Sequence, residues 1–442
     1  AVQKGNNQCF QQILEMTFGH VTVNKFNLIF KTIIMTKKQP KVTMIGLGYI
    51  GLPTAAVIAS NKIEVVGVDV NQSVVDTINE GKIHIVEPAL DGLVKKVVEE
   101  EYLKASKECE ESDVFIVAVP TPFKENNVPD LTYVEKATRS AIPALKEGDL
   151  FIIESTSPVG TTEKMAELIY EERPELKGKL HIAYCPERVM PGKVIYELEN
   201  NDRVIGGMDE QSAEKAAGFY SIFVSANLHT TTARTAEMCK LTENSFRDVN
   251  IAFANELSII AEKAGINVWE LIEMANKHPR VNILQPGTGV GGHCIAVDPW
   301  FIVSEFPEEA KIIHQARKIN DYKADWVVER IKNEILEFHL EHNRKPRVAL
   351  MGLAFKPDID DLRESPAIYV ANQITKFDKA EYLVTEPNIN GNSETGFDLV
   401  EYTEAFDKAD IVTFLVAHRE FRIIEKDNKK AELDFCGARK RI

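Results

Sequence analysis

The sequence predicts an α/β protein in which two Rossmann-like, doubly wound domains are joined by a central all-helical dimerisation domain. Two observations lead to this fold class. Short apolar runs that indicate buried strands alternate with helical patterns near both ends of the chain, as in a mostly parallel sheet. Between them, from residue 235, long segments without proline carry a helical pattern. Because the chain has 442 residues, more than one core is expected.

The predicted domains follow these changes of pattern. Residues 37–233 form the first Rossmann domain, 234–341 the helical domain and 342–442 the second Rossmann-like domain. Residues 1–36 are expected to be a non-native or disordered extension, because they show little periodicity and precede a segment that has the form of a natural start. The expected strands are 42–45, 63–70, 113–122, 150–158, 180–188, 380–387 and 409–418, and the long helical stretches are 235–265 and 308–341.

Composition excludes several classes of protein. The net charge of -15 argues against a nucleic-acid partner, which would require a basic surface. No apolar run is long enough to cross a membrane. The six cysteines are scattered without metal-ligand spacing, so we expect a reduced, cytoplasmic protein without a metal site.

A glycine-rich motif opens the first Rossmann domain. Gly46, Gly48 and Gly51 form a GxGxxG pattern directly after a strand and at the start of a helix. In this pattern the first glycine makes the turn, the second admits a pyrophosphate and the third packs the helix on the sheet. Asp69 ends the next strand, where a carboxylate accepts ribose hydroxyls and would repel a 2′-phosphate. The sequence therefore predicts NAD as the cofactor.

The second Rossmann-like domain lacks this motif. Phe355 and Lys356 stand where the later glycines would be, so we expect a different, phosphorylated ligand, held by Lys356 and Arg363. In the first domain, polar residues follow three strands and are expected to meet at one edge of the sheet; they are Thr121, Pro122, Glu154, Ser155, Thr156, Glu187 and Arg188.

Lys240, Asn244 and Arg247 fall near one face of the long helix. Cys294 lies in a loop among three glycines, four residues before Asp298. A cysteine near a dinucleotide site suggests an oxidation that continues past the aldehyde, through a thioester, to an acid. We expect Lys240 to lower the pKa of this thiol, and the glycines to admit the cofactor and substrate to the sulfur.

Several long motifs resemble the UDP-glucose/GDP-mannose dehydrogenase family: "GLGYIGLP", "ESTSPVGTTEKMAE", "YCPERVMPG", "HPRVNILQPGTGVGGHCIAVDPWF" and "GLAFKPDIDDLRESPA". The likeness extends from about residue 40 to the C-terminus. It implies a four-electron oxidation of a UDP-sugar at C6 by two NAD, for surface polysaccharide biosynthesis. The run after Glu187 differs from that of UDP-glucose enzymes and is similar to the branch that acts on UDP-N-acetyl-D-mannosamine.

The resemblance also implies residue roles. Cys294 would be the nucleophile, Lys240 an acid/base or electrostatic group assisted by Asn244 and Asp298, and Thr156 and Glu187 would handle water and protons in hydrolysis. NAD would be held by Tyr49, Ile50, Asp69, Thr121, Thr156 and Arg363. The UDP-sugar would be held by Arg188, Val189, Lys240, Asn244, Arg247, His278, Arg280, Gly291, Phe355 and Lys356. In such enzymes the residue matching Arg280 reaches in from the partner subunit, which implies a homodimer.

Three alternatives remain open at this stage. The chain could be a 6-dehydrogenase of another UDP-hexose, such as UDP-N-acetylglucosamine or UDP-glucose. It could be a two-electron hydroxyacid dehydrogenase, which would stop after one hydride and need no cysteine. A protein that only senses NAD would have no turnover at all.

Overall fold

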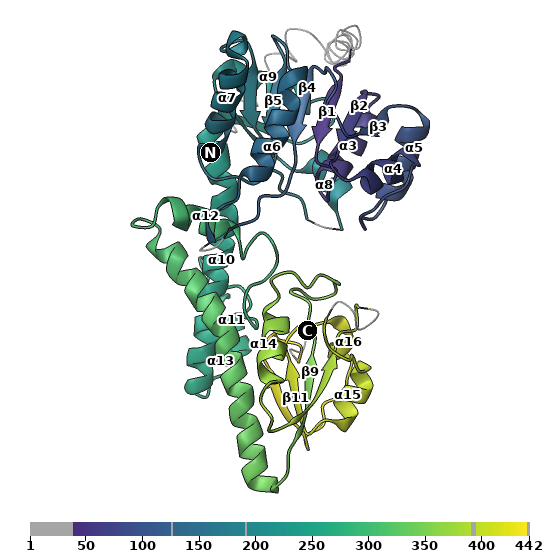
Figure 1. The fold of residues 1–442 in the computed structure, drawn as a ribbon. Coiled ribbons are helices and arrows are strands. Elements are labelled where there is room, and N and C mark those ends of the chain that lie inside the picture. Colours follow the sequence, from purple (N-terminus) through teal and green to yellow (C-terminus); the bar gives the residue numbers. More distant parts are fainter. Residues whose placement is uncertain (1–38, 125–126, 191, 390–394, 440–442) are drawn as a thin grey trace, which may run out of the picture.

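The computed structural model describes residues 39–124, 127–190, 192–389 and 395–439. The extension expected at residues 1–36 lies outside the described residues. Figure 1 shows two α/β parts connected by long helices, and the predicted α/β fold with a helical central part is confirmed. Helix and strand labels follow that figure.

The first part contains an eight-stranded sheet with the order β3-β2-β1-β4-β5-β6-β7-β8. All neighbours are parallel except β6 and β7, which are antiparallel. The strands are β1 (Val42–Ile45), β2 (Val65–Val68), β3 (Leu103–Ser106), β4 (Val114–Val117), β5 (Leu150–Ile153), β6 (His181–Tyr184), β7 (Arg203–Gly207) and β8 (Leu228–Thr232). The sequence did not predict β3, β7 and β8. Of these, β3 and β8 are edge strands with polar, partly exposed residues, and β7 contains two glycines, which are unfavourable in strands.

Helices cover both faces of this sheet and build two apolar layers. The layer on one face draws residues from α3, α4, α5, α8 and α9, and the layer on the other from α6 and α7. The strands β1, β2, β4 and β5 are buried along their whole length between these layers. The helices are α3 (Gly51–Ser60), α4 (Gln72–Asn79), α5 (Leu90–Glu99), α6 (Thr132–Ala141), α7 (Thr161–Glu172), α8 (Val194–Asn200) and α9 (Glu210–Tyr220), with short 3-10 turns at Ile142–Ala144 and Pro174–Leu176.

The middle of the chain is helical, with α10 (Ala233–Lys263), α11 (Val268–Ala275), α12 (Asp298–Glu305) and α13 (Lys311–His342). Buried polar pairs join α10 to α13. The Arg317 guanidinium donates to Asp248 at 2.7 Å and the Lys323 ammonium to Ser258 Oγ at 2.8 Å. Because buried polar groups need their partners, these pairs favour one register of the two helices. The helices α10 and α13 therefore form a fixed support for the loop after α11.

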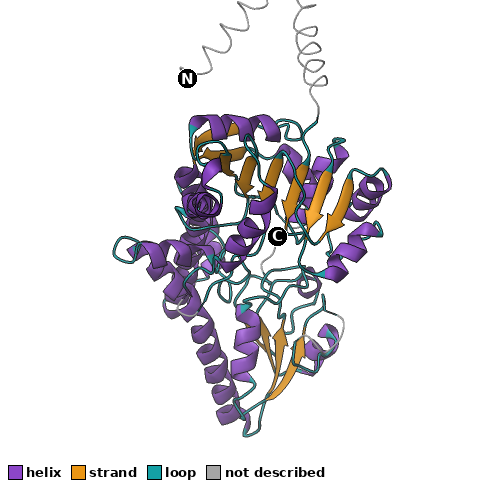
Figure 2. Ribbon diagram, turned by 45° about the horizontal axis from the view of Figure 1, so that its top comes forward, coloured by secondary structure: helices purple, strands orange, loops and turns teal. Residues whose placement is uncertain are grey.

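The last part has a four-stranded parallel sheet with the order β10-β9-β11-β12. Its strands are β9 (Arg347–Met351), β10 (Glu381–Thr385), β11 (Ile411–Phe414) and β12 (Ala431–Asp434), and its helices α14 (Pro366–Ile374), α15 (Tyr402–Lys408) and α16 (Arg419–Arg422). Side chains of α13 enter its apolar core. In Figure 2, loops fill the region between the two sheets. The predicted functional residues lie mostly on such loops.

The loop after β1 gives a first testable prediction. A Cβ on Gly51 would lie 1.8 Å from the Gly46 carbonyl oxygen, whereas a Cβ on Gly48 would meet nothing within 4 Å. We expect Gly51→Ala to destabilise the first domain by about 2 kcal/mol or more, through overpacking against backbone. Gly48→Ala should stay within about 0.5 kcal/mol of the parent. Thermal unfolding of both variants checks this, and equal midpoints for the two would contradict it.

Candidate active site

The three glycines of the first loop have the surroundings that their predicted roles require. Gly46 has φ +96°, and a Cβ there would lie 2.4 Å from the Ala118 carbonyl oxygen. Gly51 packs against Gly46, and Gly48 faces open space. A phosphate could thus approach the backbone at Gly48, next to the N-terminus of α3, where anions are stabilised.

Asp69 lies beside this loop at the end of β2. The Leu47 N–H donates to its Oδ2 at 3.1 Å and the Asn71 N–H to its Oδ1 at 2.9 Å. The carboxylate remains partly exposed, so it can still accept hydrogen bonds from a ligand. Tyr49, 54% exposed, and Ile50 follow on the same loop. These residues fit the adenosine and pyrophosphate of a dinucleotide.

Cys294 and Asp298 form one compact turn at the start of α12. The Cys294 carbonyl accepts the N–H groups of Val297 at 3.0 Å and Asp298 at 2.8 Å. The Asn244 amide on α10 donates to Asp298 Oδ2 at 2.5 Å. Asp298 is buried, and this burial raises its pKa to about 6, although the Lys240 charge and the Asn244 hydrogen bond act in the opposite direction. Four of the predicted catalytic residues are therefore brought together.

The pKa of the Cys294 thiol depends mainly on its burial. Burial raises the pKa of Cys294 to about 11, and the Asp298 carboxylate adds to the rise. Lys240 and Arg363 lower the pKa, as expected for Lys240, but by less than burial raises it. Lys240 thus acts in the predicted direction, but burial dominates and the net pKa of the thiol is raised in the protein without ligands. At neutral pH this cysteine is a protonated thiol.

The glycines before Cys294 are required by packing against the last domain. A Cβ on Gly291 would lie 2.5 Å from the Glu364 carbonyl oxygen, and one on Gly292 would lie 2.7 Å from the Phe355 ring. The Gly292 N–H also donates to the Arg363 carbonyl at 3.1 Å. These two glycines thus admit another part of the chain to the loop, whereas the sequence analysis assigned that room to cofactor and substrate.

Arg363 connects all three parts of the chain. Its guanidinium lies 5.9 Å from the centre of the Tyr49 ring and pairs with Asp361 at 2.6 Å. Its positive charge also acts on the Cys294 thiol. The predicted cofactor residues Tyr49 and Arg363 therefore lie near each other, and Lys356, on the same segment as Phe355, is exposed to solvent.

Glu187 belongs to a buried group of polar residues next to β6. Its Oε2 accepts from Arg203 Nη1 at 3.0 Å, and its Oε1 from the Arg188 N–H at 2.6 Å. Arg203 Nη1 is also 4.0 Å from Glu154 Oε1, which accepts the Tyr220 hydroxyl at 2.6 Å. The sequence analysis missed Arg203 and Tyr220, because neither stands in a recognisable motif.

Glu154 has fewer polar contacts than Glu187. Its Oε2 is buried and has no hydrogen-bond partner among the described residues. Burial raises its pKa to about 7, with the Glu187 charge adding to the rise and Arg203 opposing it. Two carboxyl groups that share one arginine are not both readily ionised. Arg203 Nη1 donates to Glu187 at 3.0 Å, whereas its distance to Glu154 is 4.0 Å.

The other predicted residues are in varied surroundings. Arg188 donates to Glu243 on α10 at 2.5 Å and to the Asp202 carbonyl at 2.5 Å, while Val189 packs against the apolar core of the first domain. Thr121 and Thr156 are partly exposed beyond the ends of β4 and β5. The remaining three are exposed to solvent: Arg247, His278 and Arg280.

Among the described residues, no helix combines the length and the apolar character needed to cross a membrane.

Comparison with known proteins identifies the architecture. Three domain models of the UDP-glucose/GDP-mannose dehydrogenase family match the chain: the NAD binding domain at residues 40–224, the central domain at 234–322 and the UDP binding domain at 349–437. The UDP-N-acetyl-D-mannosamine dehydrogenase of Campylobacter jejuni is 56% identical, over 90% of this chain and 99% of that protein. An NDP-N-acetyl-D-galactosaminuronic acid dehydrogenase of Ralstonia nicotianae is 52% identical, over 89% and 94%.

A solved structure agrees with these relatives. The UDP-D-ManNAc dehydrogenase of Pyrococcus horikoshii superimposes with a TM-score of 0.82 at 38% identity, covering 91% of this chain and 96% of that one. The order of the three domain models along the chain agrees with the order of the three parts in the structure. The chain therefore belongs to the UDP-glucose/GDP-mannose dehydrogenase family of NAD-dependent oxidoreductases.

Proposed function

We propose that this enzyme oxidises UDP-N-acetyl-D-mannosamine at C6 to UDP-N-acetyl-D-mannosaminuronate, for surface polysaccharide biosynthesis in the cytoplasm. The reaction removes four electrons and consumes two NAD+ and one water. The observation that carries this proposal is the turn of Cys294 and Asp298, bonded to Asn244 and acted on by Lys240 and Arg363. The names of the relatives from Campylobacter jejuni and Pyrococcus horikoshii favour the mannosamine sugar.

Residues of the first domain would hold NAD, which supplies a hydride acceptor for each of the two oxidations. Gly48 leaves room for the pyrophosphate and Asp69 can accept the ribose hydroxyls. Tyr49, Ile50, Thr121, Thr156 and Arg363 complete the proposed set. The UDP-sugar would lie against Arg188, Val189, Phe355 and Lys356, with Gly291 beside them.

In the first oxidation the C6 hydroxyl loses its proton while its carbon loses a hydride, which gives an aldehyde. Lys240 is the proposed acid/base group, because its charge acts on both Asp298 and the thiol. Asn244 holds Asp298 by a hydrogen bond. Asn244 and Asp298 thereby keep a negative charge near the proposed position of the C6 hydroxyl, which must lose its proton.

In the second oxidation the Cys294 sulfur adds to the aldehyde carbon, the thiol proton leaves and the aldehyde oxygen takes up a proton, giving a thiohemiacetal. Loss of a second hydride and the hydroxyl proton gives a thioester on Cys294. The protonated resting thiol has a functional advantage, because a thiolate at rest would be open to oxidation and alkylation. Asp298, whose pKa of about 6 leaves it ionised at neutral pH, is the proposed acceptor of the thiol proton.

Hydrolysis of the thioester releases the acid and regenerates the thiol. Glu187 and Thr156 are proposed to orient the water and receive its proton. Arg203 donates a hydrogen bond to Glu187, and this contact would hold the carboxylate in place for that role. Glu154 lies 4.0 Å from Arg203, and burial raises its pKa to about 7.

The second candidate is a 6-dehydrogenase of another UDP-hexose, since the 52% identical Ralstonia relative carries the name of a galactosaminuronic acid enzyme.

His278, Arg280 and Arg247 are exposed, so we further propose that they complete the substrate site in a homodimer. The side chains Phe246, Phe253 and Ile260 support a homodimer. They recur every seven residues along α10 and are 71%, 54% and 56% exposed, as expected for a helix face that packs on a second copy.

Stoichiometry tests the proposed reaction. With UDP-N-acetyl-D-mannosamine limiting, we expect two NADH per sugar and the uronate as product. UDP-N-acetylglucosamine, UDP-glucose and GDP-mannose should give kcat/KM values at least about tenfold lower, the usual discrimination when a buried polar group loses its partner. Absorbance of NADH and mass spectrometry of the product measure both quantities. One NADH per sugar would instead favour the two-electron alternative.

The control for this assay is Cys294→Ser. Removal of the nucleophile is expected to reduce uronate formation by about 10³-fold or more, the range seen when a covalent catalyst is deleted. Binding of NAD, followed by fluorescence, should remain near that of the parent. Uronate formation at the parental rate would contradict the covalent route.

The electrostatics of the thiol predict the effect of Asp298→Asn. Because the Asp298 charge raises the pKa of Cys294, its removal should speed alkylation of Cys294 by iodoacetamide at pH 8 about three- to tenfold. Lys240→Met should slow it. Mass spectrometry of the Cys294 peptide measures the rate, and the Cys239 peptide serves as the internal control. Slower labelling of Asp298→Asn would show that the charge assignment is wrong.

The proposed homodimer is tested by Phe253→Glu. A carboxylate in the apolar α10 face should convert the dimer to a monomer, since an unpaired charge in an interface is strongly unfavourable. Light scattering after size exclusion gives the mass. Ile312→Glu, at a 73% exposed position on α13, is the matched control and should remain dimeric. A dimeric Phe253→Glu variant would locate the interface elsewhere.

A further inference from the structure

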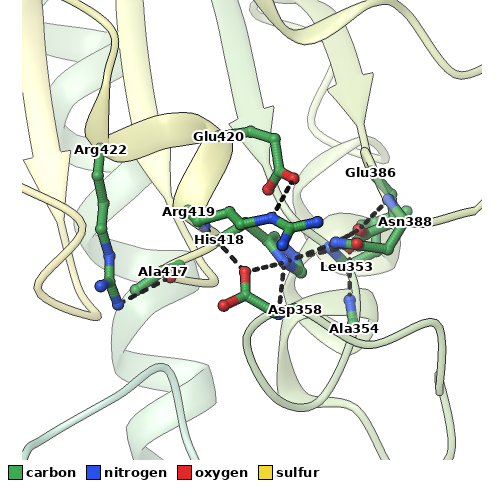
Figure 3. A network of polar contacts seen from close by, with 10 residues as sticks. All are labelled: Leu353, Ala354, Asp358, Glu386, Asn388, Ala417, His418, Arg419, Glu420 and Arg422. Carbon is green, nitrogen blue, oxygen red and sulfur yellow. Dashed lines mark hydrogen bonds and ion pairs between the residues drawn. The ribbon is translucent and has the colours of Figure 1, made fainter. Parts of the chain in front are cut away.

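A buried carboxylate–histidine–amide cluster lies at the carboxyl ends of β9, β10 and β11, and the proposed mechanism does not use it (Figure 3). We propose that Glu386, Asn388 and His418 are positioning residues, which fix the loop 355–358 in the shape that binds the diphosphate and nucleoside of the substrate. This inference rests on the proposed function, in which Phe355 and Lys356 of that loop contact the UDP-sugar. We refer to the three residues as the clamp.

The clamp holds the loop on both sides. Before the loop, Glu386 Oε2 accepts the N–H groups of Leu353 at 2.7 Å and Ala354 at 2.9 Å. At its end, His418 Nδ1 accepts the Asp358 N–H at 3.0 Å. Asp358 has φ +62°, a conformation that non-glycine residues adopt only when their surroundings hold it. The segment between these anchors has little freedom to move.

His418 joins the two anchors. Its Nε2 lies 3.0 Å from Glu386 Oε2, and the Asn388 amide donates to its Nδ1 at 2.9 Å. Because Nδ1 accepts from N–H donors, the partners assign the neutral tautomer with the proton on Nε2. The ring is fully buried. A metal site formed with Asp358 and Glu420, whose ligand atoms lie within 4.8 Å, is disfavoured because both ring nitrogens are already engaged.

Glu386 occupies the place that Asp69 has in the first domain. Each ends the strand next to the first strand of its sheet, and each accepts N–H groups from the loop after that first strand. Asp69 is partly exposed, whereas Glu386 is 4% exposed and also accepts the Asn388 N–H. Glu386 therefore has no free face for ribose hydroxyls. In the last domain the Glu386 carboxylate instead serves to shape the loop 355–358.

Three substitutions of His418 test the contacts at its two ring nitrogens separately. His418→Asn retains an acceptor near Nδ1, His418→Gln retains a donor near Nε2, and His418→Ala removes both. Affinity for UDP is measured by calorimetry, and KM for the UDP-sugar, KM for NAD+ and kcat by NADH formation. His342→Ala, at an exposed position at the end of α13, is the matched control.

We expect His418→Ala to weaken UDP binding and raise the KM for the UDP-sugar about tenfold, the equivalent of one or two lost hydrogen bonds. KM for NAD+ should stay within twofold and kcat within about threefold. His418→Asn should recover most of the loss, because the loop anchor at Asp358 is restored. If His418→Ala does not fold, the Asn and Gln variants still give the comparison.

Two results would overturn the inference. Parental UDP affinity in both His418→Ala and His418→Gln would show that the loop does not need the clamp. Equal losses for UDP and NAD+ would show a general structural role. If the parent enzyme itself fails to bind UDP or to turn over any UDP-sugar, the proposed function is wrong, which is a separate outcome from failure of the clamp.

Discussion

The contact between the cysteine loop and the last domain is the constraint on which the rest of the site depends. Gly291 and Gly292 lie so close to Glu364 and Phe355 that no Cβ fits at either position. Because residues 291 and 292 directly precede His293 and Cys294, the thiol has a fixed place relative to the proposed UDP-binding loop. The long helices maintain this contact. Asn255 on α10 accepts the Gly287 N–H at 2.8 Å and donates to Asn320 on α13 at 2.9 Å, so the loop is tied to both helices before it reaches the last domain.

The same contact explains the charge state of the thiol. Packing of the helical part and the last domain around the cysteine loop removes water from Cys294, and desolvation favours the neutral form of any acid. Two positive groups, Lys240 and Arg363, partly offset this effect. The same desolvation raises the pKa of Asp298. The folded protein binds this proton more tightly than the unfolded chain does. The stability of the fold therefore decreases as pH rises from about 4 through 6. The site therefore retains a charged carboxylate at some loss of stability.

The sequence predicted most of the fold and the identity of the central site, but few of its supporting contacts. Buried strands were evident because β1, β2, β4 and β5 are apolar along their whole length, and the roles of Gly46, Gly48 and Gly51 follow from a local motif. The direction of the thiol pKa was not predictable, since it depends on burial and on charged groups that are distant in the chain, such as Lys240 and Arg363. Arg203 and His418 were missed for a related reason. Their roles come from partners on other strands, and nothing adjacent in sequence marks them.

The two Rossmann-like parts show how one local arrangement can serve two purposes. In both, a glycine with φ +96° follows the first strand, and a carboxylate from the neighbouring strand accepts N–H groups of the next turn. In the first part the turn continues with glycine, which leaves the backbone open and the Asp69 carboxylate partly exposed to a ligand. In the last part the turn continues with Phe355 and Lys356, and the carboxylate of Glu386 is enclosed by His418 and Asn388. In the proposed function, recognition of the ligand would thereby pass from backbone to side chains. A loop that binds through side chains needs a more rigid support than one that binds through backbone, and the enclosed carboxylate supplies that support.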